Sequence, residues 1–278
     1  MKLACADFAF PLLPFEKSLD LIAMIGVKGA DIGLFEGRGS LQPSKELKTP
    51  EKRGAALQKT LADRGLKLAD LFLQNATDFT SMAINHPEEN IRKLVRNAVE
   101  RTLVYTKAAG GSHTSLLPGV QWPEETPAQS LERSATELAW CLERAKSYGI
   151  TLSIEGHIGS HVATPQLLKR LLQLTPGLTL TLDYGHFIYQ NIRQSAVHEL
   201  IPHASHFHAR CGAPERLQTS LKNNKIDFAT ILQKMKESRY TGWLGLEYVW
   251  VDWEHCNEVD NLSETILLRD HLKRSRQA

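Results

Sequence analysis

The stretch TLTLDYGH, residues 179–186, alternates apolar with small polar side chains and then reaches an acid. Successive side chains of a β-strand point to opposite faces. Leu180 and Leu182 therefore share one face of the predicted strand, whereas the threonines and Asp183 share the other. The aliphatic face is suited to packing against helices, and the polar face carries Asp183 at the end of the strand.

Three other stretches share this arrangement, in which an apolar strand has an acid or a histidine near its C-terminal end. They are TLSIEGH (151–157), SHFHAR (205–210) and WLGLEY (243–248). In the first and the last of these, an acid closes the row that also holds the small residues. The recurrence at one end of four successive strands predicts that these ends meet.

Short apolar segments alternate with longer amphipathic ones along the whole chain, which predicts parallel βαβ units. Eight such units in 278 residues indicate an α/β fold, a single-domain (β/α)8 TIM barrel spanning 1–278. A doubly wound open sheet is the second choice, although its glycine fingerprint is absent. We predict strands at 2–8, 30–37, 66–74, 112–119, 151–157, 178–186, 203–210 and 240–248. We predict helices at 15–29, 44–65, 87–109, 127–148, from 164, near 193–200, at 227–238 and at 258–274.

Composition and charge bear on the class of partner and on the location. The chain has 33 Lys and Arg against 31 Asp and Glu, a net charge of +2, which points to neither nucleic acid nor a membrane surface. The N-terminal segment does not resemble a signal peptide, and no apolar run reaches the length of a membrane helix. The four cysteines are widely separated, so we expect reduced thiols and a cytoplasmic location.

Polar residues at the C-terminal ends of the last four predicted strands are candidates for a metal site. Glu155, Asp183, His208 and Glu247 would converge there, where TIM barrels hold their active sites. Three buried carboxylates repel one another, and a divalent cation removes that repulsion. Such a ligand set suits Mn²⁺, Mg²⁺ or Co²⁺. Taken singly, each residue has an alternative role, as an ion-pair partner or as a hydrogen-bonded core histidine.

The motifs SIEGH, LDYGH, HFHAR and GLEY resemble those of the xylose-isomerase-like sugar isomerases and epimerases. The resemblance is closest to the ketose 3-epimerase, hydroxypyruvate isomerase and inosose dehydratase branches. It implies that the four candidates above bind one divalent cation, for which Mn²⁺ is our first choice and Mg²⁺, Co²⁺ or Zn²⁺ are the alternatives. It also implies that two of them, Glu155 and Glu247, are catalytic and move protons. Homo-dimers or tetramers are common in that family.

The resemblance further implies that His186 and an arginine in the loop after His208 contact the substrate. Arg210 and Arg216 are the candidates, although the loop ARCGAPERLQ departs from the ketose 3-epimerase pattern. His113 and Phe8 are additional candidates, for which a polar loop position and core packing are the alternatives.

The predicted function is a metal-dependent isomerase or epimerase of a small ketose or hydroxy-ketone. Removing a proton beside a ketone creates an enediolate, which a cation stabilises and a carboxylate base generates. A lyase (dehydratase or decarboxylase) acting on a polyhydroxy keto compound is the alternative on the same scaffold. The substrate would be a small sugar or keto acid. A metal-dependent DNA-repair endonuclease and a non-catalytic binding barrel are the two remaining hypotheses, and the near-neutral charge weighs against the endonuclease.

Overall fold

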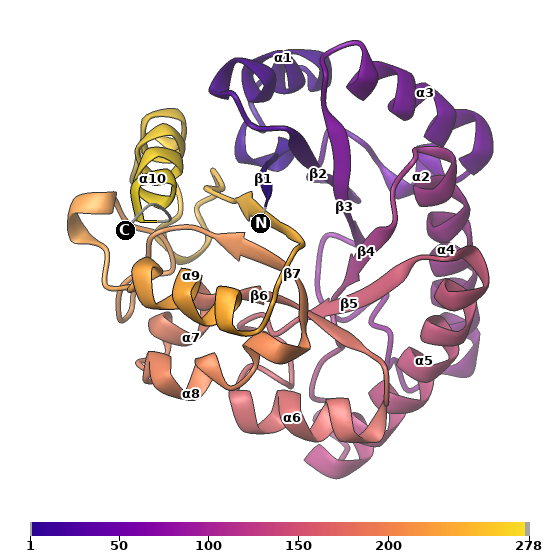
Figure 1. The fold of residues 1–278 in the computed structure, drawn as a ribbon. Coiled ribbons are helices and arrows are strands. Elements are labelled where there is room, and N and C mark those ends of the chain that lie inside the picture. Colours follow the sequence, from indigo (N-terminus) through magenta and orange to yellow (C-terminus); the bar gives the residue numbers. More distant parts are fainter. Residues whose placement is uncertain (1, 276–278) are drawn as a thin grey trace.

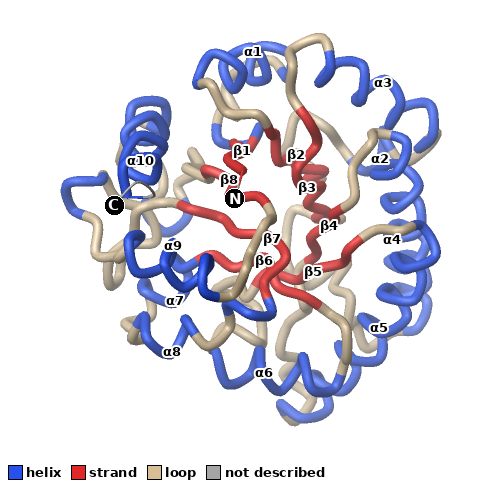
Figure 2. Tube along the Cα trace, viewed as in Figure 1, coloured by secondary structure: helices blue, strands red, loops and turns tan. Residues whose placement is uncertain are grey.

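The computed structural model describes residues 2–275 and confirms the predicted fold. Eight parallel strands form a closed barrel in chain order, surrounded by helices (Figures 1 and 2). Each strand pairs with its neighbours in sequence, and β1 closes the barrel against β8. The strands are β1 Lys2–Ala6, β2 Gly29–Phe35, β3 Lys67–Gln74, β4 His113–Leu116, β5 Thr151–Glu155, β6 Thr179–Asp183, β7 Ala204–Ala209 and β8 Trp243–Leu246.

The helices occupy the segments between successive strands and follow the last strand. They are α1 Phe15–Ile25, α2 Pro43–Glu46, α3 Pro50–Ala62, α4 Glu89–Ala108, α5 Pro127–Tyr148, α6 Pro165–Leu174, α7 Tyr184–Tyr189, α8 Gln194–His198, α9 Phe228–Glu237 and α10 Asn261–Ser275. In Figure 1, α10 lies between α9 and α1 and completes the outer ring. Within residues 2–275, no helix has both the length and the apolar character that crossing a membrane requires.

The prediction of one helix over 44–65 was wrong in one respect, because the segment forms two helices. Pro50 occupies the first turn of α3. A proline has no amide hydrogen and cannot continue a preceding helix, but it fits the first turn of a new one. The chain therefore stops after α2 and begins again at Pro50.

The two faces predicted for the strands are present. Inside the barrel, the hydroxyls of Ser115, Ser153 and Thr181 hydrogen-bond to one another at 2.6–3.0 Å. On the outer face, Ile154 and Leu180 are fully buried in the hydrophobic core. Glu155 and Asp183 lie two residues after Ser153 and Thr181, so the alternation of the strand turns their side chains into the barrel as well.

Candidate active site

The four predicted ligands lie at the C-terminal ends of adjacent strands. Glu155 and Asp183 are the last residues of β5 and β6, His208 lies near the end of β7, and Glu247 directly follows β8. All four are buried, with at most 4% of their surface exposed. The register sets Asp183 beside His208, and His208 beside Gly245. Parallel pairing thus brings the four to the same level of the barrel.

Three of these residues form one compact group. His208 Nδ1 lies 2.8 Å from Glu155 Oε1 and 3.4 Å from Glu247 Oε2. One donor atom from each residue falls within 4.8 Å of the others. Glu247 Oε2 is buried and has no hydrogen-bond partner among the described residues. An unsatisfied buried carboxylate oxygen beside an imidazole and a second carboxylate fits a divalent cation.

The fourth predicted ligand, Asp183, is engaged by Arg210. Asp183 Oδ2 accepts hydrogen bonds from Arg210 Nε at 2.9 Å and from Nη2 at 2.6 Å, while Oδ1 accepts one from the Gly185 amide. Arg210 Nη2 also lies 3.4 Å from Glu247 Oε2. Burial alone would lower the pKa of Arg210, but Asp183 and Glu247 raise it above its ordinary value. A permanent positive charge therefore lies inside the acidic cluster.

The two glutamates differ in their electrostatic surroundings. Burial alone would raise the pKa of Glu155, but the hydrogen bond and charge of His208 hold it below its ordinary value. Burial raises the pKa of Glu247 to about 8, even though His208 and Arg210 lie nearby. Burial alone would lower the pKa of His208, but Glu247 and Glu155 raise it well above its ordinary value. Two carboxylates in one site thus have opposite tendencies to hold a proton.

His186 contacts Arg210. Its side chain is fully buried, and its Nε2 is 3.1 Å from Arg210 Nη2. Burial, together with the charges of His157 and Arg210, lowers the pKa of His186 well below its ordinary value. A neutral His186 ring can accept the hydrogen bond from Arg210 Nη2.

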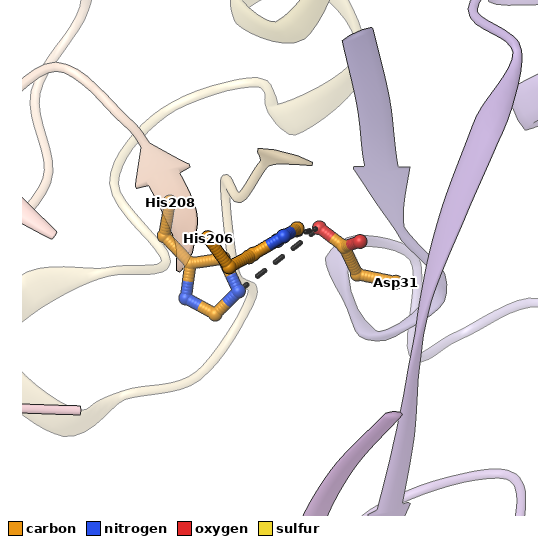
Figure 3. A group of neighbouring side chains, drawn as sticks. All are labelled: Asp31, His206 and His208. Atoms are coloured by element: carbon orange, nitrogen blue, oxygen red, sulfur yellow. Dashed lines mark hydrogen bonds and ion pairs between the residues drawn. The ribbon is translucent and has the colours of Figure 1, made fainter. Parts of the chain in front are cut away.

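A second polar layer lies deeper in the barrel, beneath the glutamates. Asp31 Oδ2 is 3.1 Å from His206 Nε2 and 4.0 Å from His208 Nε2 (Figure 3). His113, at the start of β4, uses its two ring nitrogens for Asp70 at 2.6 Å and Ser205 at 2.7 Å. The structure therefore places His113 toward the N-terminal end of the barrel, away from the three-residue group.

A cavity of about 400 Å³ opens onto this site. Among the predicted catalytic and substrate-binding residues, it is lined by Phe8, Glu155, Arg210 and Glu247. Arg216 instead pairs with Glu258 on an exposed loop. The remaining lining residues are Pro11, Phe35, Arg38, Phe72, Gln74, Thr77, Asp78, Phe79, His157, Val249, Val251 and Trp253.

Sequence reasoning missed several of these lining residues, Arg38 and Phe35 among them. Phe35 ends β2 and Arg38 follows in the next loop. Active sites of TIM barrels lie at the C-terminal ends of the strands, and this rule predicted Glu155. Applied to β2, the same rule would have indicated both Phe35 and Arg38.

Comparison with known proteins agrees with this architecture. The sequence profile of the xylose isomerase-like TIM barrel family matches residues 19–272. An inosose dehydratase from Lacticaseibacillus casei is 23% identical over 264 residues, which cover 84% of this chain and 81% of that protein.

Two solved structures share the fold. D-psicose 3-epimerase, in the presence of D-fructose, aligns with a TM-score of 0.79 and 14% identity, covering 100% of both chains. The IolI protein with a binding zinc atom aligns with a TM-score of 0.76 and 15% identity, covering 100% of this chain and 98% of the other. The profile match extends over nearly all of the sequence, so the chain belongs to the xylose isomerase-like TIM barrel family.

Proposed function

We propose that the protein is a divalent-metal-dependent isomerase or epimerase that converts a small ketose or related hydroxy-ketone through an enediolate. One observation carries this proposal: Glu155 and Glu247 line the same cavity, and His208 lies within 3.4 Å of both. Two carboxylates on separated strands can act on a substrate from two directions. Family membership supports the same class of chemistry.

Glu155, His208 and Glu247 would hold the cation, with Asp183 as the fourth ligand. Carboxylate and imidazole donors suit Mn²⁺, which is our first choice, and also Mg²⁺, Co²⁺ and Zn²⁺. When bound, the cation acts as a Lewis acid that stabilises negative charge on the substrate's carbonyl and hydroxyl oxygens.

The protein's own groups move the proton. One glutamate removes it from the carbon beside the ketone, and the other returns a proton to the resulting enediolate. Return to the opposite face of the same carbon yields an epimer, whereas return to the neighbouring carbon yields an isomer. Arg210, held by Asp183, adds a fixed positive charge to the cavity wall.

A lyase is the second candidate, and the likeness to an inosose dehydratase favours it. The first step is the same proton abstraction. A hydroxyl on the adjacent carbon then leaves with a proton as water, and a carbon–carbon double bond forms in place of the broken C–H and C–O bonds.

Deuterium exchange tests both candidates. The metal-stripped protein, reloaded with Mn²⁺, is incubated in D₂O with ketoses, keto acids and inososes, and carbon-bound protons are followed by NMR. We expect metal-dependent deuterium uptake that Glu155→Gln and Glu247→Gln abolish and that Glu258→Gln, an exposed control, preserves. The product then separates isomerase from lyase. Undiminished deuterium uptake in both glutamine variants would contradict the proposal.

A further inference from the structure

The lining of the cavity above Glu155 and Glu247 combines buried charged side chains, apolar side chains and exposed residues. Glu155, Arg210 and Glu247 are almost fully buried. Arg38 and Thr77 lie among the exposed residues of the same lining. A substrate that fills the cavity therefore contacts both the charged and the apolar residues of the lining.

Aromatic rings form much of the apolar lining. Phe35 lies 4.8 Å from Phe8 and 5.4 Å from Phe72, measured between ring centroids. Phe79 and Trp253 form a second aromatic contact at 6.3 Å. Pro11, Val249 and Val251 complete the apolar lining, in which Val251 and Trp253 are exposed. None of the phenylalanine or valine side chains can hydrogen-bond to a hydroxyl.

This lining suits an apolar ring better than a polyol. A sugar carries a hydroxyl on nearly every carbon, and each hydroxyl buried without a partner costs about 1–3 kcal/mol. A ring compound instead gains from burial against the phenylalanines and from edge or offset contacts with them. The aromatic lining therefore disfavours a substrate that carries a hydroxyl on every carbon.

The rim supplies an available positive charge. Arg38 hydrogen-bonds to the Gln74 side chain, and its guanidinium lies 5.9 Å from the centre of the Phe35 ring. Within residues 2–275, Arg38 forms no ion pair with a carboxylate. The acid at the rim, Asp78, accepts hydrogen bonds from the backbone and hydroxyls of Thr80 and Ser81 instead.

We propose that the substrate is a ring compound with a hydroxy-ketone at one end and a carboxylate at the other, and that Arg38 is the residue that recognises the carboxylate. This deepens the proposed function and rests on it. The planar guanidinium fork matches a carboxylate in two parallel hydrogen bonds. The hydroxy-ketone then faces Glu155 and Glu247, while the ring packs against Phe35 and Phe72.

Binding of simple probes tests the proposal without turnover. Trp253 lines the cavity, so its fluorescence, checked by calorimetry, can report binding of benzoate, benzyl alcohol, phenyl phosphate and D-fructose to the full chain. We expect benzoate to bind about tenfold more tightly than benzyl alcohol. Arg38→Gln should abolish that preference. Arg170→Gln, at an exposed position of α6, should leave it intact.

Three outcomes overturn the assignment. They are equal binding of benzyl alcohol and benzoate to the unmodified protein, a benzoate preference that persists in Arg38→Gln, and tighter binding of D-fructose than of both aromatic probes. Tighter binding of phenyl phosphate than of benzoate overturns the choice of carboxylate and points to a phosphate. Failure here leaves the glutamate-dependent deuterium exchange untouched, so the two proposals fail separately.

Discussion

The Asp31 carboxylate occupies the space where a side chain at Gly245 would lie. A Cβ atom added at position 245 would lie 1.8 Å from Asp31 Oδ2, which no pair of atoms tolerates. The same oxygen is 3.1 Å from His206 Nε2. The missing side chain on β8 therefore lets a carboxylate from β2 reach the histidines of β7 (Figure 3).

Gly245→Ala should displace Asp31 and lower the free energy of unfolding by about 1–3 kcal/mol, because the barrel interior has no room for the methyl group. Urea unfolding measures the loss. In the double variant with Asp31→Ala the clash disappears, so the combined loss should be smaller than the sum of the two single losses by more than about 0.5 kcal/mol. Additive losses would contradict a direct clash.

Cation binding should stabilise the metal-stripped protein. A ligand that binds only the folded state at 100 times its dissociation constant adds about 2.7 kcal/mol to the free energy of unfolding. We expect Mn²⁺ to raise the melting temperature, and Glu155→Gln or Glu247→Gln to remove most of that gain. Glu258→Gln, on an exposed loop, is the matched control. A full Mn²⁺ response in both cavity variants would place the cation elsewhere.

Arg210→Met should destabilise the protein by about 3–5 kcal/mol, because it leaves Asp183 and Glu247 buried without their counter-charge. Arg210→Lys keeps the charge but loses the paired N–H donors, so it should recover part of the loss. Chemical denaturation of the three proteins at one pH measures the order. Equal stability of the methionine and unmodified proteins would show that the ion pair is not needed.

The buried Asp7 should make stability fall as the pH rises. Burial raises the pKa of Asp7 from 3.8 to about 7. Between these two values the folded protein holds a proton that the unfolded chain releases, so the free energy of unfolding decreases with pH. From pH 5 to 8 the decrease should be on the order of 2 kcal/mol.

Asp7→Asn supplies the control for this slope, because an asparagine can still accept the hydrogen bond that the Gly33 amide donates to Asp7 Oδ1 at 2.8 Å. Comparing urea unfolding of the two proteins at pH 5 and pH 8 isolates the contribution of the carboxyl group. Identical pH dependence in both would show that Asp7 ionises normally.

Much of the fold could be predicted from local pattern. The alternation in residues 179–183 and the repeated βα units indicated a parallel barrel with a polar interior, and the closed barrel confirms both. The division at Pro50 was also present in the sequence, since proline favours the first turn of a helix. A single helix over 44–65 is wrong because it overlooks this break.

The site was only partly predictable. Strand ends identified Glu155, His208 and Glu247 as neighbours, and the structure brings them within 4.8 Å. It also shows what spacing along the chain cannot show: Arg210 engages Asp183, and His113 pairs with Asp70 deeper in the barrel. Which partner a charged side chain takes depends on distances between strands far apart in sequence.

By itself, the sequence determined which residues lie near the C-terminal ends of the last four strands and which face each side chain takes, because the two-residue period of a strand is a local property of the backbone. It did not determine where a strand stops, since the strand predicted over 178–186 ends at Asp183 and α7 begins at Tyr184. Only the tertiary structure decided which of those ends share a cavity, that Arg38 and Phe35 from β2 and its loop join Glu247 from β8, and that Gly245 makes way for Asp31. Those relations arise from barrel closure, which sets the distances between residues more than 200 positions apart.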